Sequence, residues 1–195
     1  MGDNVRTARP DTIGLLEVSS IGLGFAAEDA MLKAASVELL LARTICSGKY
    51  LVVVAGDVAS VQASVEAGEN AVHDGLIESR VIPRLHPSVF PAISQSVDID
   101  PESAQALGIV ETFSAAAIVE AADAAAKAAA VTLFRIHLAM AIGGKGFLLM
   151  TGDVASVKAG VEAGAQVAGS EGMLVSKVVI PAPPPLRWTR SPLTS

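Results

Sequence analysis

The sequence contains few charged residues, few aromatic rings and a single cysteine. Charged residues make up 17% of the 195 residues, and aromatic residues make up 4%. A lone cysteine, Cys46, excludes a disulfide framework within the chain. Lysine and arginine are scattered and the net charge is −6, so the sequence predicts no surface for binding nucleic acid.

Long apolar runs are also missing. The nearest approach to one, residues 133–150, is interrupted by Arg135, His137 and Lys145, which predicts two strands joined by a glycine turn and no membrane span. The first ten residues are polar and lack the apolar stretch of a signal peptide, so we expect a cytoplasmic protein. Hydrophobic residues nevertheless reach 51%, and many of them are small. Such an excess is typical of a chain that buries further surface in an oligomer.

The two halves of the chain repeat each other. Matching segments are separated by 94 residues near the start of each copy, by 96 in the middle and by 98 near the end. Each step corresponds to a two-residue insertion in the second copy, the first between Val37 and Gly48 and the second between Gly68 and Val81. Insertions within a kept framework indicate that one fold was duplicated. Three matched pairs carry the repeat: 13–17 with 107–111, 56–61 with 152–157, and 81–83 with 179–181.

Each copy has the pattern strand, helix, strand, strand, helix, strand. In the first copy, alanines at helical spacing predict a helix over 22–35, and Asp57 is placed to cap a second helix that ends at Gly68 or Gly75. We therefore expect an α/β chain of the α+β kind with a ferredoxin-like βαββαβ layout in each half. The predicted boundaries are a first domain at 12–91, a linker at 92–105 and a second domain at 106–185. The predicted strands of the first copy are 12–19, 37–44, 50–55 and 76–82.

Four motifs in order resemble the bacterial microcompartment shell domain. They are I-G-L-L-E at 13–17, D-A-M-L-K-A-A at 29–35, G-D-V-A-S-V at 56–61 and V-I-P-R-L-H at 81–86. Two such domains in one chain resemble the tandem-domain class of shell proteins. The resemblance implies a structural role and not catalysis: a homotrimer that forms a flat pseudohexameric tile and meets other shell proteins at its edges. It also implies a place in the compartment shell, with neither nucleic acid nor membrane as a partner.

The two turns extend the resemblance to a central site. Thr44–Lys49 and Ala141–Lys145 are similar to the turns of iron–sulfur-binding trimeric shell proteins from propanediol-utilisation compartments. This implies that Cys46 binds a [4Fe–4S] cluster, one per trimer, because three symmetry-related thiolates meet at the axis and cysteine thiolates are the usual ligands of such clusters. The enclosed redox enzymes are a further class of partner. The implied pore-lining residues are Thr44, Ile45, Ser47, Gly48, Lys49, Ile142, Gly143, Gly144 and Lys145.

Simpler interpretations of these turns remain open. Cys46 could be an unliganded thiol that lines or closes a pore. Lys49 and Lys145 follow glycines, but neither turn has the first glycine or the final hydroxyl residue of a phosphate-binding loop, so we reject a nucleotide site. Either lysine could be an ordinary solvated side chain.

The resemblance also implies a set of tile-edge residues, Asp29, Lys33, Arg84 and Lys127, although Ala182 replaces the arginine in the second copy. The alternative for each is a solvated surface charge.

Three functions from different classes follow from the sequence. The first is a shell tile that passes electrons through a cluster at Cys46. The second is a tile with a central pore for small metabolites and no cluster. The third is an enzyme or signal-binding domain, since such folds host many functions. The histidines have no metal-binding spacing, and Asp57 and Asp153 are more simply helix caps than catalytic acids. We therefore predict that the chain is not an enzyme.

Overall fold

The chain folds as two units that repeat the same order of elements. A computed structural model describes residues 9–100 and 104–184, and the chain divides after Leu85 into unit 1 and unit 2. The elements of unit 1 are β1 (Thr12–Val18), α1 (Ile21–Ala34), β2 (Glu38–Ile45), β3 (Lys49–Gly56), α2 (Val58–Val72) and β4 (Leu76–Ile82). Those of unit 2 are α3 (Val89–Ile93), β5 (Ala106–Thr112), α4 (Ala115–Ala128), β6 (Thr132–Leu138), β7 (Gly146–Gly152), α5 (Val154–Ser170) and β8 (Leu174–Pro181).

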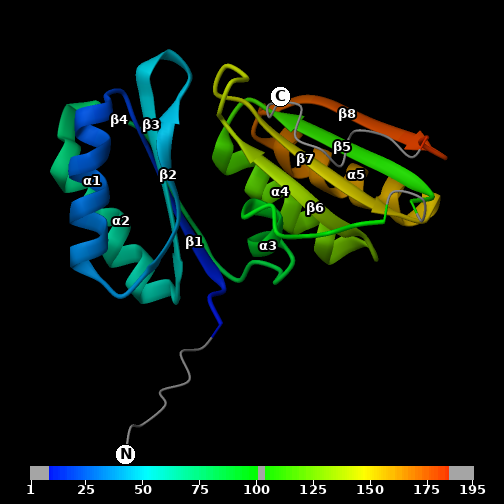
Figure 1. The fold of residues 1–195 in the computed structure, drawn as a ribbon, viewed down its shortest axis with the longest axis horizontal. Coiled ribbons are helices and arrows are strands. Elements are labelled where there is room, and N and C mark those ends of the chain that lie inside the picture. The colour runs from blue at the N-terminus through cyan, green and yellow to red at the C-terminus, as the bar shows by residue number, and fades with distance from the viewer. Residues whose placement is uncertain (1–8, 101–103, 185–195) are drawn as a thin grey trace, which may run out of the picture. The chain divides into compact units, whose positions relative to one another are not determined.

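Each unit contains one four-stranded antiparallel sheet. The strand order is β2-β3-β1-β4 in unit 1 and β6-β7-β5-β8 in unit 2, and in each unit the two long helices lie on one face of the sheet (Figure 1). The registers correspond as well: Ile13 faces Ala55 in unit 1, and Leu107 faces Thr151 in unit 2. The predicted α+β class and the βαββαβ order are confirmed in both halves.

Alternating apolar residues build the core between sheet and helices. In unit 1, Leu16, Val52 and Val54 point from the strands toward Met31 of α1 and Val61 of α2, and all five are fully buried. Side chains alternate between the two faces of a strand, so the run of valines in β3 supplies residues to both faces. The β-branched side chains suit this pleated surface.

The repeated aspartates cap the second helix of each unit, as predicted. The carboxylate of Asp57 accepts a hydrogen bond from the backbone N–H of Ser60 at 3.0 Å, and that of Asp153 accepts from Ala155 and Ser156 at 2.9 Å each. The pKa of Asp57 is lowered mainly by the backbone N–H of Ser60, and that of Asp153 mainly by the hydroxyl of Ser156. The ionised form suits the positive end of a helix. Both residues therefore have a structural role.

Of the two predicted ends of the second helix, Gly68 is wrong, and the helical stretch ends near Gly75. α2 continues to Val72 because Gly68 is buried against α1, where a Cβ atom would lie 2.7 Å from Cγ of Met31. This glycine allows the two helices to approach closely. The chain leaves the helix at His73, which has a φ of 39°, and a short turn to Gly75 follows.

Part of the predicted linker is packed against unit 2. Helix α3 contacts β6 and α4, and its residues Ala92 and Ile93 are buried. Further along, Val97 and Ile99 pack against apolar side chains on the sheet of unit 2. Residues 101–103 and the predicted domain end at 185 lie outside the described residues, so the exact domain boundaries stay a prediction.

Two glycines of α5 provide a matched pair for testing this packing. A Cβ atom at Gly164 would lie 2.8 Å from the backbone oxygen of Ala121 in α4, whereas one at Gly169 would meet no atom within 4 Å. We expect Gly164→Ala to lower the free energy of unfolding by about 1–3 kcal/mol because the backbone of α4 must move. Gly169→Ala should raise the free energy of unfolding by about 0.5–1 kcal/mol, because alanine loses less conformational entropy than glycine when a helix forms. Urea unfolding measures both, and equal effects would contradict the helix packing.

Candidate functional site

The turn that contains Cys46 connects β2 to β3 in unit 1. Ile45 faces Lys49 across the two strands, so Cys46, Ser47 and Gly48 form the tip. Ser47 and Gly48 have φ angles of 65° and 73°, in the left-handed region. Cys46 is half-buried and its two successors are exposed. A Cβ atom at Gly48 would meet no other atom within 4 Å, so glycine is needed there for its conformation and not for space.

The corresponding turn of unit 2 is longer. The backbone N–H of Ala139 donates to the carbonyl of Lys145 at 2.9 Å, in the place of the Ile45 and Lys49 pair. Five residues, 140–144, then form the tip where unit 1 has three, so the first predicted insertion lies in the turn itself. Gly143 and Gly144 have φ angles of 70° and 84°, and a Cβ atom on either would meet nothing within 4 Å.

A lysine at the base of each turn forms an ion pair with the central strand of its own sheet. Lys49 Nζ lies 2.8 Å from Glu17 Oε1, and Lys145 Nζ lies 3.1 Å from Glu111 Oε1. The Glu17 side chain is only 8% exposed, whereas that of Glu111 is 30% exposed. The lysines predicted to line a pore therefore hold the base of each turn against β1 and β5.

Sequence reasoning missed the two glutamates as part of this site. The signal was present, because both end the repeated opening motif of their copy. Glu17 lies opposite Leu51 in the sheet, and Lys49 is two positions from Leu51 on the same face of β3. Glu17 and Lys49 are therefore diagonal neighbours across the antiparallel pair, close enough for long side chains to meet.

His137 gives the longer turn a second anchor. Its Nε2 lies 2.7 Å from the carbonyl oxygen of Met140. A carbonyl oxygen only accepts hydrogen bonds, so Nε2 carries the hydrogen. The imidazole ring also stacks on Phe147, with ring centroids 4.9 Å apart. The buried histidine thus holds the first residue of the glycine turn to β6.

The predicted tile-edge residues lie on the helices and after β4, apart from the turns. Lys33 pairs with Asp29 at 2.7 Å along α1, and Lys127 pairs with Asp123 at 2.6 Å along α4. Arg84 is exposed and has a φ of 56°, and its counterpart Ala182 has a φ of 44°. The kept backbone conformation shows that the chain turns in the same way after both sheets, although only unit 1 has the arginine.

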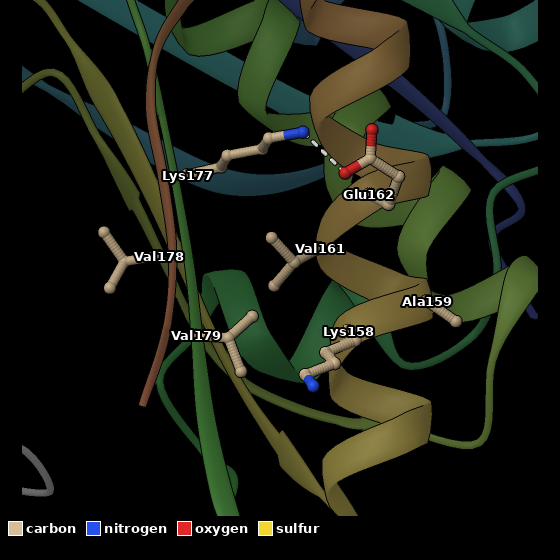
Figure 2. Close-up of a pocket in the computed structure, with 7 residues that line it drawn as sticks. All are labelled: Lys158, Ala159, Val161, Glu162, Lys177, Val178 and Val179. Carbon is tan, nitrogen blue, oxygen red and sulfur yellow. Dashed lines mark hydrogen bonds and ion pairs between the residues drawn. The ribbon is translucent and has the colours of Figure 1, made fainter. Parts of the chain in front are cut away.

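The pocket in Figure 2 lies between α5 and β8 and has no catalytic set of residues. Its lining consists of three valines, Ala159, Lys158, Glu162 and Lys177. Figure 2 shows Lys177 and Glu162 pointing toward each other, and their ion pair is 2.5 Å long. A second pocket borders the capping residue Asp57. Neither lining includes a histidine or a cysteine.

Within residues 9–100 and 104–184, no group of three or more histidine, cysteine, aspartate or glutamate side chains could hold a metal ion. One chain therefore offers Cys46 alone as a thiolate ligand.

None of the described helices is long and apolar enough to cross a bilayer.

The chain is similar to known shell proteins along nearly all of its length. The BMC domain family matches residues 12–85 and again 106–183. The shell protein PduT of Citrobacter freundii is 47% identical over 176 residues, which are 90% of this chain and 95% of the relative. The shell protein EutM of Salmonella typhimurium is 44% identical over 79 residues, covering 40% of this chain and 80% of EutM.

Solved structures agree with this assignment. A microcompartment protein from Desulfitobacterium hafniense superposes with a TM-score of 0.85 and 50% identity, over 89% of this chain and 95% of that chain. The fused permuted hexameric shell protein MSM0275 gives a TM-score of 0.55 at 17% identity, over 82% and 84% of the two chains, which shows a shared fold. The chain is therefore a tandem-domain member of the BMC domain family, a structural shell protein of a bacterial microcompartment.

Proposed function

We propose that three copies of this chain form one flat tile of the shell and that their three Cys46 thiolates bind a [4Fe–4S] cluster on the threefold axis. The observation that carries the proposal is the difference between the two turns. Unit 1 presents Cys46 in a tip of three residues, and unit 2 presents glycines in a tip of five. A trimer therefore has three thiols around its axis, which a single chain lacks.

The residues of the turn fit a cluster by their chemistry. Cysteine thiolate is the usual ligand of iron–sulfur clusters. The half-buried Cys46 is followed by the exposed Ser47 and Gly48 at the end of the β2–β3 hairpin. Three thiolates would leave one iron for a ligand that is not a protein side chain. A backbone N–H group that lies close to a cluster sulfur would stabilise the negative charge on it.

Each residue of the turn has its own task in this proposal. Cys46 supplies the ligand, while buried Ile45 and the Glu17–Lys49 ion pair fix the base of the hairpin. Because Glu17 neutralises Lys49, the lysine adds little net charge at the axis. A bound cluster supplies one-electron transfer, so the tile would pass electrons between redox enzymes enclosed by the shell and the outside. Its edges, with Asp29, Lys33, Arg84 and Lys127, would meet other shell proteins.

The glycine turn favours a second candidate function, a central pore for small metabolites. Gly143 and Gly144 have no side chains, and a Cβ atom on either would meet no atom within 4 Å. Glycines at this turn would therefore leave a central opening wider than bulkier residues would. In this alternative Cys46 has no ligand role.

Anaerobic purification of the wild-type chain tests the proposal. Sedimentation should give the mass of a trimer, and assays should find about 1.3 iron and 1.3 sulfide per chain, as expected for one [4Fe–4S] cluster shared by three chains. Visible absorbance from sulfur-to-iron charge transfer should accompany the iron. A trimer that stays free of iron after reconstitution with iron and sulfide would favour the pore.

A further inference from the structure

The segment that follows β4 covers an edge of unit 2, whereas none of the residues in 9–100 and 104–184 covers the matching edge of unit 1 in this way. In unit 2, helix α3 packs on β6 and α4, and Val89, Ala92 and Ile93 are buried there. The backbone N–H of His86 also donates to the carboxylate of Asp123 on α4 at 2.7 Å. By the repeat, the corresponding edge of unit 1 is formed by β2 and α1.

Matched positions show the difference in burial. Leu133 of β6 is 1% exposed, while its counterpart Leu39 of β2 is 38% exposed. Val119 of α4 is fully buried, while its counterpart Phe25 of α1 is 60% exposed. The side chain of Asp123 is 16% exposed, and that of Asp29 is 62% exposed.

The exposed apolar residues of α1 and of the start of β2 are here called the α1/β2 edge. Ile21, Phe25 and Leu32 recur at helical spacing along α1, and Leu39 follows at the start of β2. The Phe25 ring also lies 5.2 Å from the Tyr50 ring, which supports it from the core side. A preformed apolar surface of this kind is typical of an interface.

The sequence after β8 has the composition to cover this edge. The kept offset of 98 residues aligns Phe90 of α3 with Trp188, and Leu186 and Leu193 lie nearby in sequence. Residues 185–195 contain Arg187 and Arg190 and no acidic residue, whereas the α1/β2 edge has exposed Asp29 and Glu38. One hydrogen bond is not repeated, because the residue aligned with His86 is Pro184, which has no N–H.

We propose that residues 185–195 of one chain bind the α1/β2 edge of unit 1 in the next copy of the chain. This rests on the proposed trimer. Within a chain, the segment that follows unit 1 covers an edge of unit 2. In a closed ring of three chains, unit 2 is followed by unit 1 of the next chain, so by the repeat the segment after unit 2 would cover the matching edge of that unit 1. The C-terminal segment thus ties each chain to the next.

The only tryptophan of the chain, Trp188, reports on this contact directly. In the assembled full-length protein its fluorescence should be blue-shifted and several-fold less quenched by iodide than in a synthetic peptide of residues 185–195. Phe25→Ser and Leu39→Asp should each return the emission to that of the peptide. Leu76→Asp on β4 is the matched control, because Leu76 is 36% exposed on the opposite edge of the sheet, and it should leave the emission unchanged.

A mixing experiment identifies which copy is bound. One chain carries Leu39→Asp with its C-terminal segment intact, and the other has the wild-type edge but ends at Pro184. Neither alone should give blue-shifted tryptophan emission, and co-refolding the two should restore it. A blue shift in wild type that the mixture does not restore would show binding within one chain and overturn the proposal.

Sedimentation separates this proposal from the proposed function. A trimer whose Trp188 emission equals that of the peptide would overturn the binding of the C-terminal segment and leave the tile intact. A monomer would overturn both.

Discussion

Cys46→Ser is expected to remove all cluster-bound iron from the protein while the assembled tile keeps its mass. Serine is nearly the same size as cysteine, but its hydroxyl is a poor ligand for iron compared with a thiolate. The chain has no second cysteine to take over. Iron, sulfide and visible absorbance should therefore fall to background in anaerobically purified variant protein.

Ser47→Ala is the matched control for this change. Ser47 is the exposed neighbour of Cys46 in the same tip and already has a left-handed backbone, so its replacement alters the turn without removing the ligand. We expect it to keep the iron content of the wild type. Equal iron in wild type and Cys46→Ser would show that the metal is bound elsewhere.

Lys49→Met is expected to destabilise unit 1 by about 2–4 kcal/mol, because it leaves the buried carboxylate of Glu17 without its cation. Methionine keeps most of the length of the lysine side chain, so packing changes little. Chemical unfolding followed by circular dichroism measures the effect. The same change in the second turn, Lys145→Met, should lower stability by less than about 1 kcal/mol, since water reaches the more exposed Glu111.

The double variant Glu17→Gln with Lys49→Met separates charge from shape. It should recover most of the lost stability, because no buried charge is left unpaired. Equal losses at Lys49 and Lys145, or no recovery in the double variant, would contradict the difference in burial of the two ion pairs.

The repeat made the fold predictable from sequence. Offsets of 94, 96 and 98 residues located the insertions, and the capping aspartates and the two hairpins were expected where they are found. The helix end at Gly68 was mistaken because a glycine also serves where two helices touch, and its partner Met31 is 37 positions away in the sequence. Local pattern does not reveal such a contact.

The site was predictable only in its exposed part. The turns were recognised from their glycines and from Cys46, but the glutamates beneath them depend on strand register. His137 is similar: its bond to Met140 and its stacking on Phe147 arise from the pairing of β6 with β7. The packing of α3 on unit 2 was also unexpected, because residues 92–105 look polar as a sequence although Ala92 and Ile93 are buried.

The arrangement of the three Cys46 sulfur atoms in a structure of the assembled protein tests the central claim most directly. With iron–thiolate bonds near 2.3 Å reaching one cubane, the Sγ atoms should lie roughly 6–7 Å apart around a threefold axis, with anomalous scattering from iron between them. Sulfur atoms spread around a wide open channel, without iron density, would contradict the cluster and leave the protein as a shell tile with a pore.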